Sequence, residues 1–287
     1  MAEYSAAALL DVVNTKHTAP ANERVRAITA RIVADLFRTI EDFDITHEEF
    51  FTAIKWLNEV GQGGQFGLVA PGLGFDRLLD IRADEADRRS GRLAGTPRAI
   101  EGPLYIPGAP LSKYEARLDD GSDAAEPLIM EGCVLDTGGR AIPDAIVDVW
   151  HANSKGGYSH FDPSQKPYNL RRRIQTDKQG RYRFRSIMPS GYAVPPDSPT
   201  ERFLKALGRH GRRPAHIHFM VSAAGHRTLT TQINIPGDEY LNDDFAFATR
   251  DELVVTLESI DDPARIAAAG EDRPYARTQF AFTLAPA

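Results

Sequence analysis

The stretch RPAHIHF, residues 213–219, alternates polar and apolar side chains as a β-strand does, and it carries two imidazoles one residue apart. Successive side chains of a strand point to opposite faces, so His216 and His218 share one face, and the apolar residues between and after them share the other. Two imidazoles on one face supply half of a metal site. The plain alternative is a strand that carries two hydrogen-bonded histidines and no metal.

The period of two recurs through the C-terminal half of the chain. Segments rich in Val, Ile, Phe and Thr predict strands at residues 128–135, 145–151, 181–185, 216–221, 228–235, 253–257 and 279–284. Turn sequences such as DTGG at 136–139 and DKQG at 177–180 separate them. One short helix, from Ser198 as N-cap to Gly208 as terminator, interrupts the strands. Short strands without helices between them predict an antiparallel β-sandwich.

The N-terminal part of the chain has a helical pattern instead. Apolar residues spaced by three, four and seven predict a helix over 23–44, and Thr46 with Glu49 forms a capping box that starts a second helix ending near Gly61. A weaker pattern predicts a helix over 5–14.

The segment 62–110 is punctuated by glycine and proline, which predicts loops with short helical pieces. We therefore expect an α+β fold. Residues 1–110 would form an N-terminal helical and linker region that serves dimerisation and supplies part of a pocket wall, and residues 111–287 would form a β-sandwich catalytic domain.

Composition excludes several classes of partner. The chain has 287 residues and a formal net charge of -6, which argues against nucleic acid as a partner. It has neither a secretory signal pattern nor an apolar run of about 20 residues, so membrane insertion is not expected. The one cysteine, Cys133, excludes an internal disulfide and lies in a predicted strand as a small buried residue. These features predict a cytoplasmic protein.

Further histidines or a carboxylate could complete the site around His216 and His218. A cupin-like site needs a glutamate three to four residues after the second histidine, but MVS follows at 220–222. A zinc site needs a third protein ligand. Four histidines are available, although no spacing singles one of them out: His151, His160, His210 and His226.

Tyrosine is the other candidate donor. Tyr158 and Tyr192 each follow a glycine, where the backbone is free to aim a side chain inward. A phenol has an ordinary pKa near 10, so it binds as phenolate only to a cation of strong Lewis acidity, and ferric iron is such a cation. Either tyrosine alone is equally consistent with a packing or turn residue.

Five motifs in a fixed order resemble those of the intradiol ring-cleavage dioxygenases, and within that family they are most similar to the enzymes that act on catechol. The motifs are IEGPLY at 100–105, WHAN at 150–153, YSHFD at 158–162, PSGY at 189–192 and RPAHIH at 213–218. The resemblance implies cleavage of catechol between its two hydroxyl-bearing carbons by O2, giving cis,cis-muconate without an organic cofactor. Enzymes for chlorocatechol or hydroxyquinol are the nearest alternatives. A non-catalytic β-sandwich carrier or binding module is the alternative of a different class.

The resemblance also implies particular roles for particular residues. One Fe(III) per subunit would be held by four ligands: Tyr158, Tyr192, His216 and His218. Tyr192 would accept a proton from the substrate and leave the metal. Arg213 would stabilise negative charge on the substrate, and Gln232 would lie beside the iron as a neutral hydrogen-bonding group. A surface arginine and a glutamine on a sheet face are the plain alternatives for the last two.

The implied pocket wall is mostly apolar and small, which suits a flat aromatic ring. It consists of Leu68, Pro71, Ile100, Pro103, Leu104, Phe245, Ala246 and Ala248. Hydroxyquinol enzymes tend to have an acidic residue at or just after the position of Pro71, where this chain has PGL at 71–73, and this departure favours catechol. Ala248 leaves room for a methyl group or chlorine. The resemblance further implies a homodimer through the N-terminal helices and allows a phospholipid at that interface.

Overall fold

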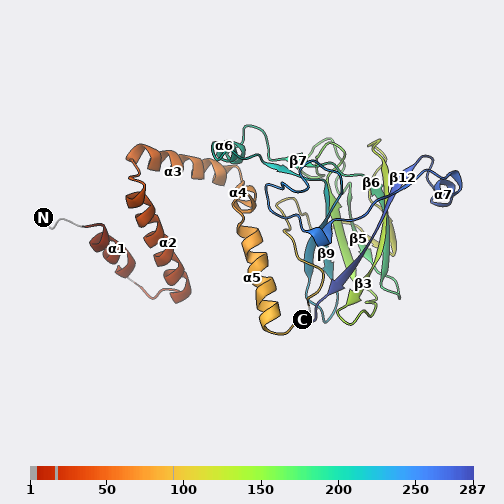
Figure 1. Ribbon diagram of the computed structural model, residues 1–287, viewed down its shortest axis with the longest axis horizontal. Coiled ribbons are helices and arrows are strands. Elements are labelled where there is room, and N and C mark those ends of the chain that lie inside the picture. Colours follow the sequence, from red (N-terminus) through yellow and green to blue (C-terminus); the bar gives the residue numbers. More distant parts are fainter. Residues whose placement is uncertain (1–4, 17–18, 93) are drawn as a thin grey trace. The chain divides into compact units, whose positions relative to one another are not determined.

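The computed structural model describes residues 5–16, 19–92 and 94–287 (Figure 1). The chain divides into two compact units, residues 1–63 and residues 64–287. The described part of the first unit is helical, and the second unit contains two large β-sheets.

Three helices make up the described part of the first unit: α1 (Ala6–Thr15), α2 (Glu23–Asp42) and α3 (His47–Gln62). The sequence pattern predicted all three, and Thr46 forms the predicted capping box with Glu49. The apolar stripe of α2 is exposed, although an amphipathic helix normally buries such a face. Among the described residues, no helix combines the length and the apolar character needed to cross a bilayer.

The second unit begins with α4 (Phe66–Gly72) and α5 (Phe75–Arg89). The short α4 fits the predicted helical pieces, but the prediction of mainly loops over 62–110 is wrong for the fifteen residues of α5. Its sequence, FDRLLDIRADEADRR, is built largely from good helix formers, yet its charges obscure an apolar stripe. Gly74, with a φ of 78°, separates the two helices.

Two five-stranded sheets follow, and Figure 1 shows them layered against each other. The first has the order β1 (Leu111–Lys113), β5 (Arg171–Gln175), β4 (Ile146–His151), β9 (His216–Ser222) and β10 (Leu229–Asn234). The second has the order β11 (Glu258–Ile260), β12 (Tyr275–Leu284), β3 (Pro127–Asp136), β6 (Arg181–Ile187) and β2 (Glu115–Arg117). A small third sheet pairs β7 (Tyr192–Ala193) with β8 (Arg212–Arg213).

The predicted sandwich is confirmed, and its sheets are mixed. The long pairing of β12 with β3 is parallel, as are the short pairings of β1 with β5 and β2 with β6. The predicted helix after Ser198 is α6 (Pro199–Ala206), whereas α7 (Pro263–Ala268) was not predicted. The predicted strand over 253–257 is wrong, because a 3-10 helix (Asp251–Leu253) ends in this region, Val254 makes only an isolated bridge, and the next strand, β11, begins at Glu258.

The core lies between the two large sheets. The ring of Phe219 on β9 lies 4.9 Å from that of Phe282 on β12 and 6.4 Å from that of Phe184 on β6. Because side chains alternate along β9, the two histidines of this strand point away from this core, to the outer face of their sheet. Cys133 on β3 is half-buried, and burial raises the pKa of its thiol, so it does not have the character of a reactive cysteine.

Asp148 on β4 gives the folded protein a defined pH dependence. Its Oδ2 accepts a hydrogen bond of 2.9 Å from the hydroxyl of Tyr105, and the carboxylate is buried. Burial raises the pKa of Asp148 to about 6, from 3.8. The folded state therefore binds more protons than the unfolded state between these values, and the stability contributed by this group falls as the pH rises through that window.

We expect Asp148→Asn to raise the free energy of unfolding at pH 7 by up to about 3 kcal/mol, because the amide is not charged and still accepts from Tyr105. Below about pH 4 the two proteins should be equally stable. Urea denaturation across this pH range measures both. A variant that is less stable than the parent at pH 7 would show that the buried carboxylate does not destabilise the fold.

Candidate metal centre

The imidazoles of His216 and His218 meet at their tips. Their Nε2 atoms are 3.0 Å apart, and each residue is only 1% exposed. Nδ1 of His216 lies 2.6 Å from the carbonyl of Pro214, to which it donates, so its Nε2 carries the lone pair that would bind a metal. In this structure Nη1 of Arg213 donates to that lone pair at 3.0 Å. Burial lowers the pKa of both imidazoles well below 6.5, and the charge of Arg213 adds to this effect. Both are therefore neutral, which is the form that binds metals.

A loop after β4 and the short strand β7 bring the predicted tyrosines Tyr158 and Tyr192 to the same cluster. The ring of Tyr192 lies 5.5 Å from that of Tyr158 and 5.5 Å from that of His216. The hydroxyl of Tyr158 is buried without a hydrogen-bond partner among the described residues. Buried polar groups are nearly always satisfied, so an orphaned phenol oxygen beside two converging imidazoles fits a metal ligand. Burial raises its pKa well above 10, and the phenolate therefore needs a strong cation.

Glycines permit close approach around this cluster. A Cβ on Gly191 would lie 2.6 Å from the carbonyl oxygen of Arg213, so the residue before Tyr192 is a glycine for lack of space and not for positive φ. Gly102 has a φ of 71°, and a Cβ there would lie 3.7 Å from the imidazole of His218. The motif at 100–105 therefore lies against this histidine.

Arg213 is buried, 3% exposed, and its guanidinium is held in place by Asp244. Nε donates to Oδ1 of Asp244 at 3.2 Å, and Nη2 donates to Oδ2 at 3.0 Å and to Oε1 of Gln232 at 2.7 Å. Burial alone would lower the pKa of Arg213, but Asp244, Tyr192 and Tyr158 together outweigh it and raise the pKa above its ordinary value. The remaining nitrogen, Nη1, lies 3.0 Å from Nε2 of His216 and is directed at the cluster.

Sequence reasoning missed four residues around the cluster. Asp244 holds Arg213, the ring of Trp150 stacks on His218 at 4.9 Å, and the guanidinium carbon of Arg171 lies 5.8 Å from the ring centre of Tyr158. Oδ1 of Asn234 accepts from Nε2 of Gln232 at 3.1 Å. The cross-strand register explains the positions of Trp150 and Asn234. Trp150 on β4 pairs with His218 on β9, and Asn234 on β10 pairs with His216. Strand order, which local periodicity does not give, was the missing signal.

The other histidines have contacts of their own. Nδ1 of His151 donates to the carbonyl of Ala152 at 2.7 Å, its Nε2 accepts from the hydroxyl of Ser186 at 2.7 Å, and burial lowers its pKa to about 4. Hydrogen bonds or ion pairs also engage His160, His210 and His226. Across residues 5–16, 19–92 and 94–287, no group of three or more His, Cys, Asp or Glu side chains could hold a metal. The cupin and zinc alternatives therefore have no ligand set there.

Most of the predicted pocket-wall residues lie together. Five of them pack in one apolar cluster with Val194 and Leu204: Leu68, Ile100, Phe245, Ala246 and Ala248. Leu104 packs beside Trp150 and Tyr158. Pro71 is buried in α4, and Pro103 lies against Gly67. Contact of these residues with a substrate stays a prediction.

The chain matches known proteins along most of its length. A family described as "Dioxygenase" matches residues 100–284, and one described as "Catechol dioxygenase N terminus" matches residues 22–91. Catechol 1,2-dioxygenase 2 of Acinetobacter lwoffii is 56% identical over 86% of this chain and 90% of its own. The crystal structure of wild-type Acinetobacter radioresistens catechol 1,2-dioxygenase is 49% identical with a TM-score of 0.95, covering 98% of this chain and 92% of that one. Hydroxyquinol 1,2-dioxygenase of Rhizobium sp. (strain MTP-10005) is 34% identical over 84% of this chain and 82% of its own.

A β-sandwich with this cluster and these matches defines an oxidoreductase of the intradiol ring-cleaving class. The chain belongs to the catechol 1,2-dioxygenase family. Members of this family use non-haem iron. The two phenols and two imidazoles described above are a donor set that fits such an ion.

We expect Asp244→Ala to lower the free energy of unfolding by roughly 3–5 kcal/mol, because it leaves the guanidinium of Arg213 buried without its carboxylate. Asp244→Asn should cost less, since its oxygen can still accept from Arg213 and from the amide of Ala246. Urea denaturation measures both variants. The matched control is Asp243→Ala, whose side chain is 78% exposed and should change stability by less than about 0.5 kcal/mol. Equal midpoints for Asp244→Ala and the parent would show that the ion pair does not stabilise the fold.

Proposed function

We propose that this protein binds one Fe(III) per subunit, without an organic cofactor, and uses O2 to cleave catechol between its hydroxyl-bearing carbons to cis,cis-muconate. The proposed ligands are Tyr158, Tyr192, His216 and His218. The observation that carries the proposal is the convergence of these four donors in one buried cluster, with an orphaned phenol oxygen and two facing Nε2 atoms. The higher identity to a catechol 1,2-dioxygenase than to a hydroxyquinol enzyme supports catechol as the substrate.

The donor set supports ferric iron. Two phenolates provide hard anionic oxygen, and the raised pKa of Tyr158 requires a cation of strong Lewis acidity to hold it ionised. When bound, Fe(III) would act as a Lewis acid that activates the catecholate ring toward O2.

The two tyrosines differ in a way that supports different roles. Tyr158 is 3% exposed, whereas Tyr192 is partly exposed. A partly exposed phenolate can accept a proton from an incoming substrate hydroxyl. Tyr158 is then the fixed ligand, and Tyr192 is the one that exchanges with substrate.

Arg213 is the cation placed to stabilise negative charge on a bound catecholate. Asp244 and Gln232 occupy Nε and Nη2, so Nη1 is the nitrogen directed toward the metal ligands. A fixed charge of this kind needs no reorganisation during the reaction. Gln232 contributes by holding the guanidinium and by presenting a neutral amide beside the iron.

The wall formed around Phe245 is apolar, which suits the unsubstituted edge of catechol. Pro71 and the residues after it bring no acidic group that would favour a third hydroxyl, and Ala248 leaves space for a small substituent. Chlorocatechol therefore remains the second candidate substrate, ahead of hydroxyquinol.

We infer that the protein is a homodimer through its N-terminal helices. The side chains of Val25, Ile32 and Leu36 on α2 are 59%, 52% and 56% exposed, and a second copy would cover such a stripe. A phospholipid with its acyl chains along these helices would fit the same surface. In functional terms, residues 1–110 then supply dimerisation and part of the pocket wall, and residues 111–287 supply the catalytic sandwich.

Iron-loaded protein incubated with catechol and isotopically labelled O2 should give cis,cis-muconate that carries both labelled oxygen atoms. Because the wall is small and apolar, kcat/KM should be higher for catechol than for 4-chlorocatechol or hydroxyquinol. Mass spectrometry identifies the product, and initial rates give the ranking. A ring-opened semialdehyde would contradict intradiol cleavage, and a preference for hydroxyquinol would contradict the assigned substrate.

Single substitutions should separate the residues needed for metal binding from those needed only for catalysis. Tyr158→Phe and His216→Ala should lose the iron and its phenolate charge-transfer colour, because each removes a ligand. Arg213→Ala should keep the iron and its colour, and its kcat should fall by a factor of about 10²–10³, the usual effect of removing one preorganised electrostatic group. Iron content, visible absorption and turnover measure this, with the exposed neighbour Arg212→Ala as control. Full turnover in Arg213→Ala, or full iron content in both ligand variants, would contradict the assigned roles.

A further inference from the structure

Arg171, the first residue of β5, is a buried arginine outside the proposed ligand set, and it is only 1% exposed. Its Nε donates to the hydroxyl of Ser159 at 2.9 Å, and its Nη2 donates to the carbonyl of Ser159 at 3.1 Å. Its Nη1 is buried without a hydrogen-bond partner among the described residues. Its guanidinium carbon lies 5.8 Å from the ring centre of Tyr158, the residue just before Ser159.

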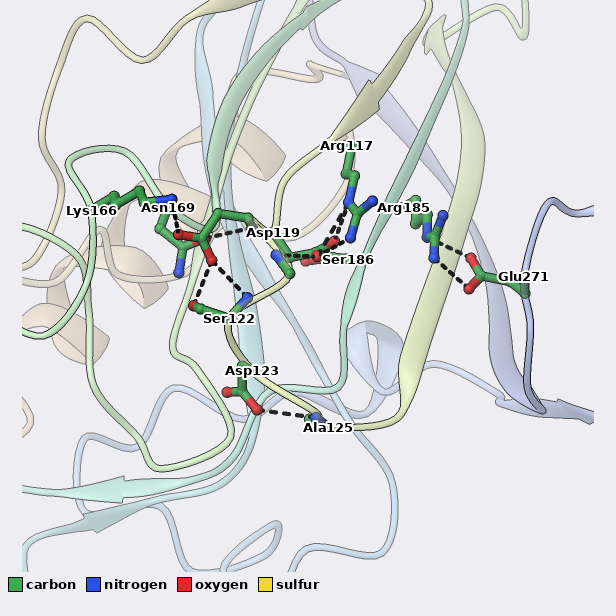
Figure 2. Close-up of polar contacts among 12 residues, drawn as sticks. Arg117, Asp119, Ser122, Asp123, Ala125, Lys166, Asn169, Arg185, Ser186 and Glu271 are labelled. Atoms are coloured by element: carbon green, nitrogen blue, oxygen red, sulfur yellow. Dashed lines mark hydrogen bonds and ion pairs between the residues drawn. The ribbon is translucent and has the colours of Figure 1, made fainter.

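Arg171 has no carboxylate within ion-pair distance among the described residues, and this distinguishes it from Arg213, the other buried arginine described, which is paired with Asp244. Figure 2 shows paired arginines on the neighbouring sheet as well, where Arg117 is paired with Asp119 and Arg185 with Glu271. A buried cation without a counter-ion is costly, so the charge of Arg171 calls for a partner within its own surroundings.

Tyr158 is the group beside the guanidinium that can take on the opposing charge, with its ring centre 5.8 Å from the guanidinium carbon. Asp148 is buried as well, but no ion pair joins it to Arg171 in the described part of the chain, and it accepts a hydrogen bond from the hydroxyl of Tyr105. A phenol becomes a permanent anion when it binds a metal, and a metal-bound Tyr158 would therefore provide a counter-charge beside the guanidinium.

We propose that Arg171 is a positioning residue for Tyr158, which it serves in two ways. Its two hydrogen bonds to Ser159 fix the loop that carries the tyrosine. Its charge, which no ion pair compensates, is balanced by the metal-bound phenolate. The inference rests on the proposed function, because it takes Tyr158 to be an iron ligand. It adds a residue that touches neither metal nor substrate and that sets the electronic character of the site.

The two roles can be separated by substitution. Arg171→Met keeps an unbranched side chain that reaches about as far as Nε, but it removes the charge and both hydrogen bonds to Ser159. Arg171→Lys keeps the charge and loses the paired hydrogen bonds to Ser159. Ser159→Ala keeps the charge of Arg171 and loses the hydrogen bond from its Nε to the Ser159 hydroxyl. The matched control is Arg172→Met, which removes the same charge from the next residue, whose side chain points to the other face of β5.

The experiment compares iron-loaded parent and variants by the wavelength of the phenolate-to-iron band, the ferric/ferrous midpoint potential and iron retention against a chelator. A cation over the ring stabilises the electrons that the phenolate donates, so Arg171→Met should shift the band to longer wavelength. Loss of a nearby positive charge should also lower the midpoint potential. Arg171→Lys and Ser159→Ala should keep the band position and release iron faster, and Arg172→Met should match the parent.

An unshifted band and unchanged potential in Arg171→Met would overturn the electrostatic role, and unchanged iron retention in Arg171→Lys and Ser159→Ala would overturn the role in positioning the loop. Should Arg171→Met fail to fold, Arg171→Gln, which keeps a donor for Ser159, takes its place with the same expected shift. A parent protein that takes up no iron and shows no band would instead overturn the proposed function, and this inference with it.

Discussion

The pairing register of β9 is the constraint on which the candidate centre depends. A slip of one residue against β4 and β10 would turn His216 and His218 into the sandwich core and turn Phe219 out of it. The contacts of Phe219 with Phe184 and Phe282 across the sandwich prevent that slip. Packing on one face of the strand therefore places the imidazoles on the other, and the stability of the core and the geometry of the centre rest on the same contacts.

The balance of charge among buried groups is a second constraint on the centre. It has two neutral imidazoles, two phenols and two buried arginines, of which only Arg213 has a carboxylate. In this arrangement the phenols are the groups that can become anionic, and the proposed ferric ion would make them so. The protein thus places two guanidinium groups around the position where the proposed phenolate ligands and a catecholate dianion would gather negative charge.

The sequence alone predicted the sandwich, the N-terminal helices and the residues that converge at the centre. Periodicity predicts which residues share one face of a strand or helix. The order of the five motifs led us to assign residues from distant loops to one site. Asp244, Trp150 and Arg171 were missed because their contacts depend on which strands and loops are neighbours. Nothing local separates Asp244 from the exposed Asp243. Helix α5 was missed because its charges weaken the apolar period, and residues 253–257 were taken for a strand because adjacent valines have high β-propensity whether or not a ladder forms.

The small sheet of β7 and β8 has a consequence for motion. Tyr192 pairs in register with Arg213, and Gly191 packs against the carbonyl of Arg213 so closely that no side chain would fit. The backbones of these two residues therefore move as one body. Displacement of the Tyr192 phenol away from the histidines is left to rotation about its side-chain bonds, so a single rotating ring, rather than an opening loop, would control access to the proposed metal position.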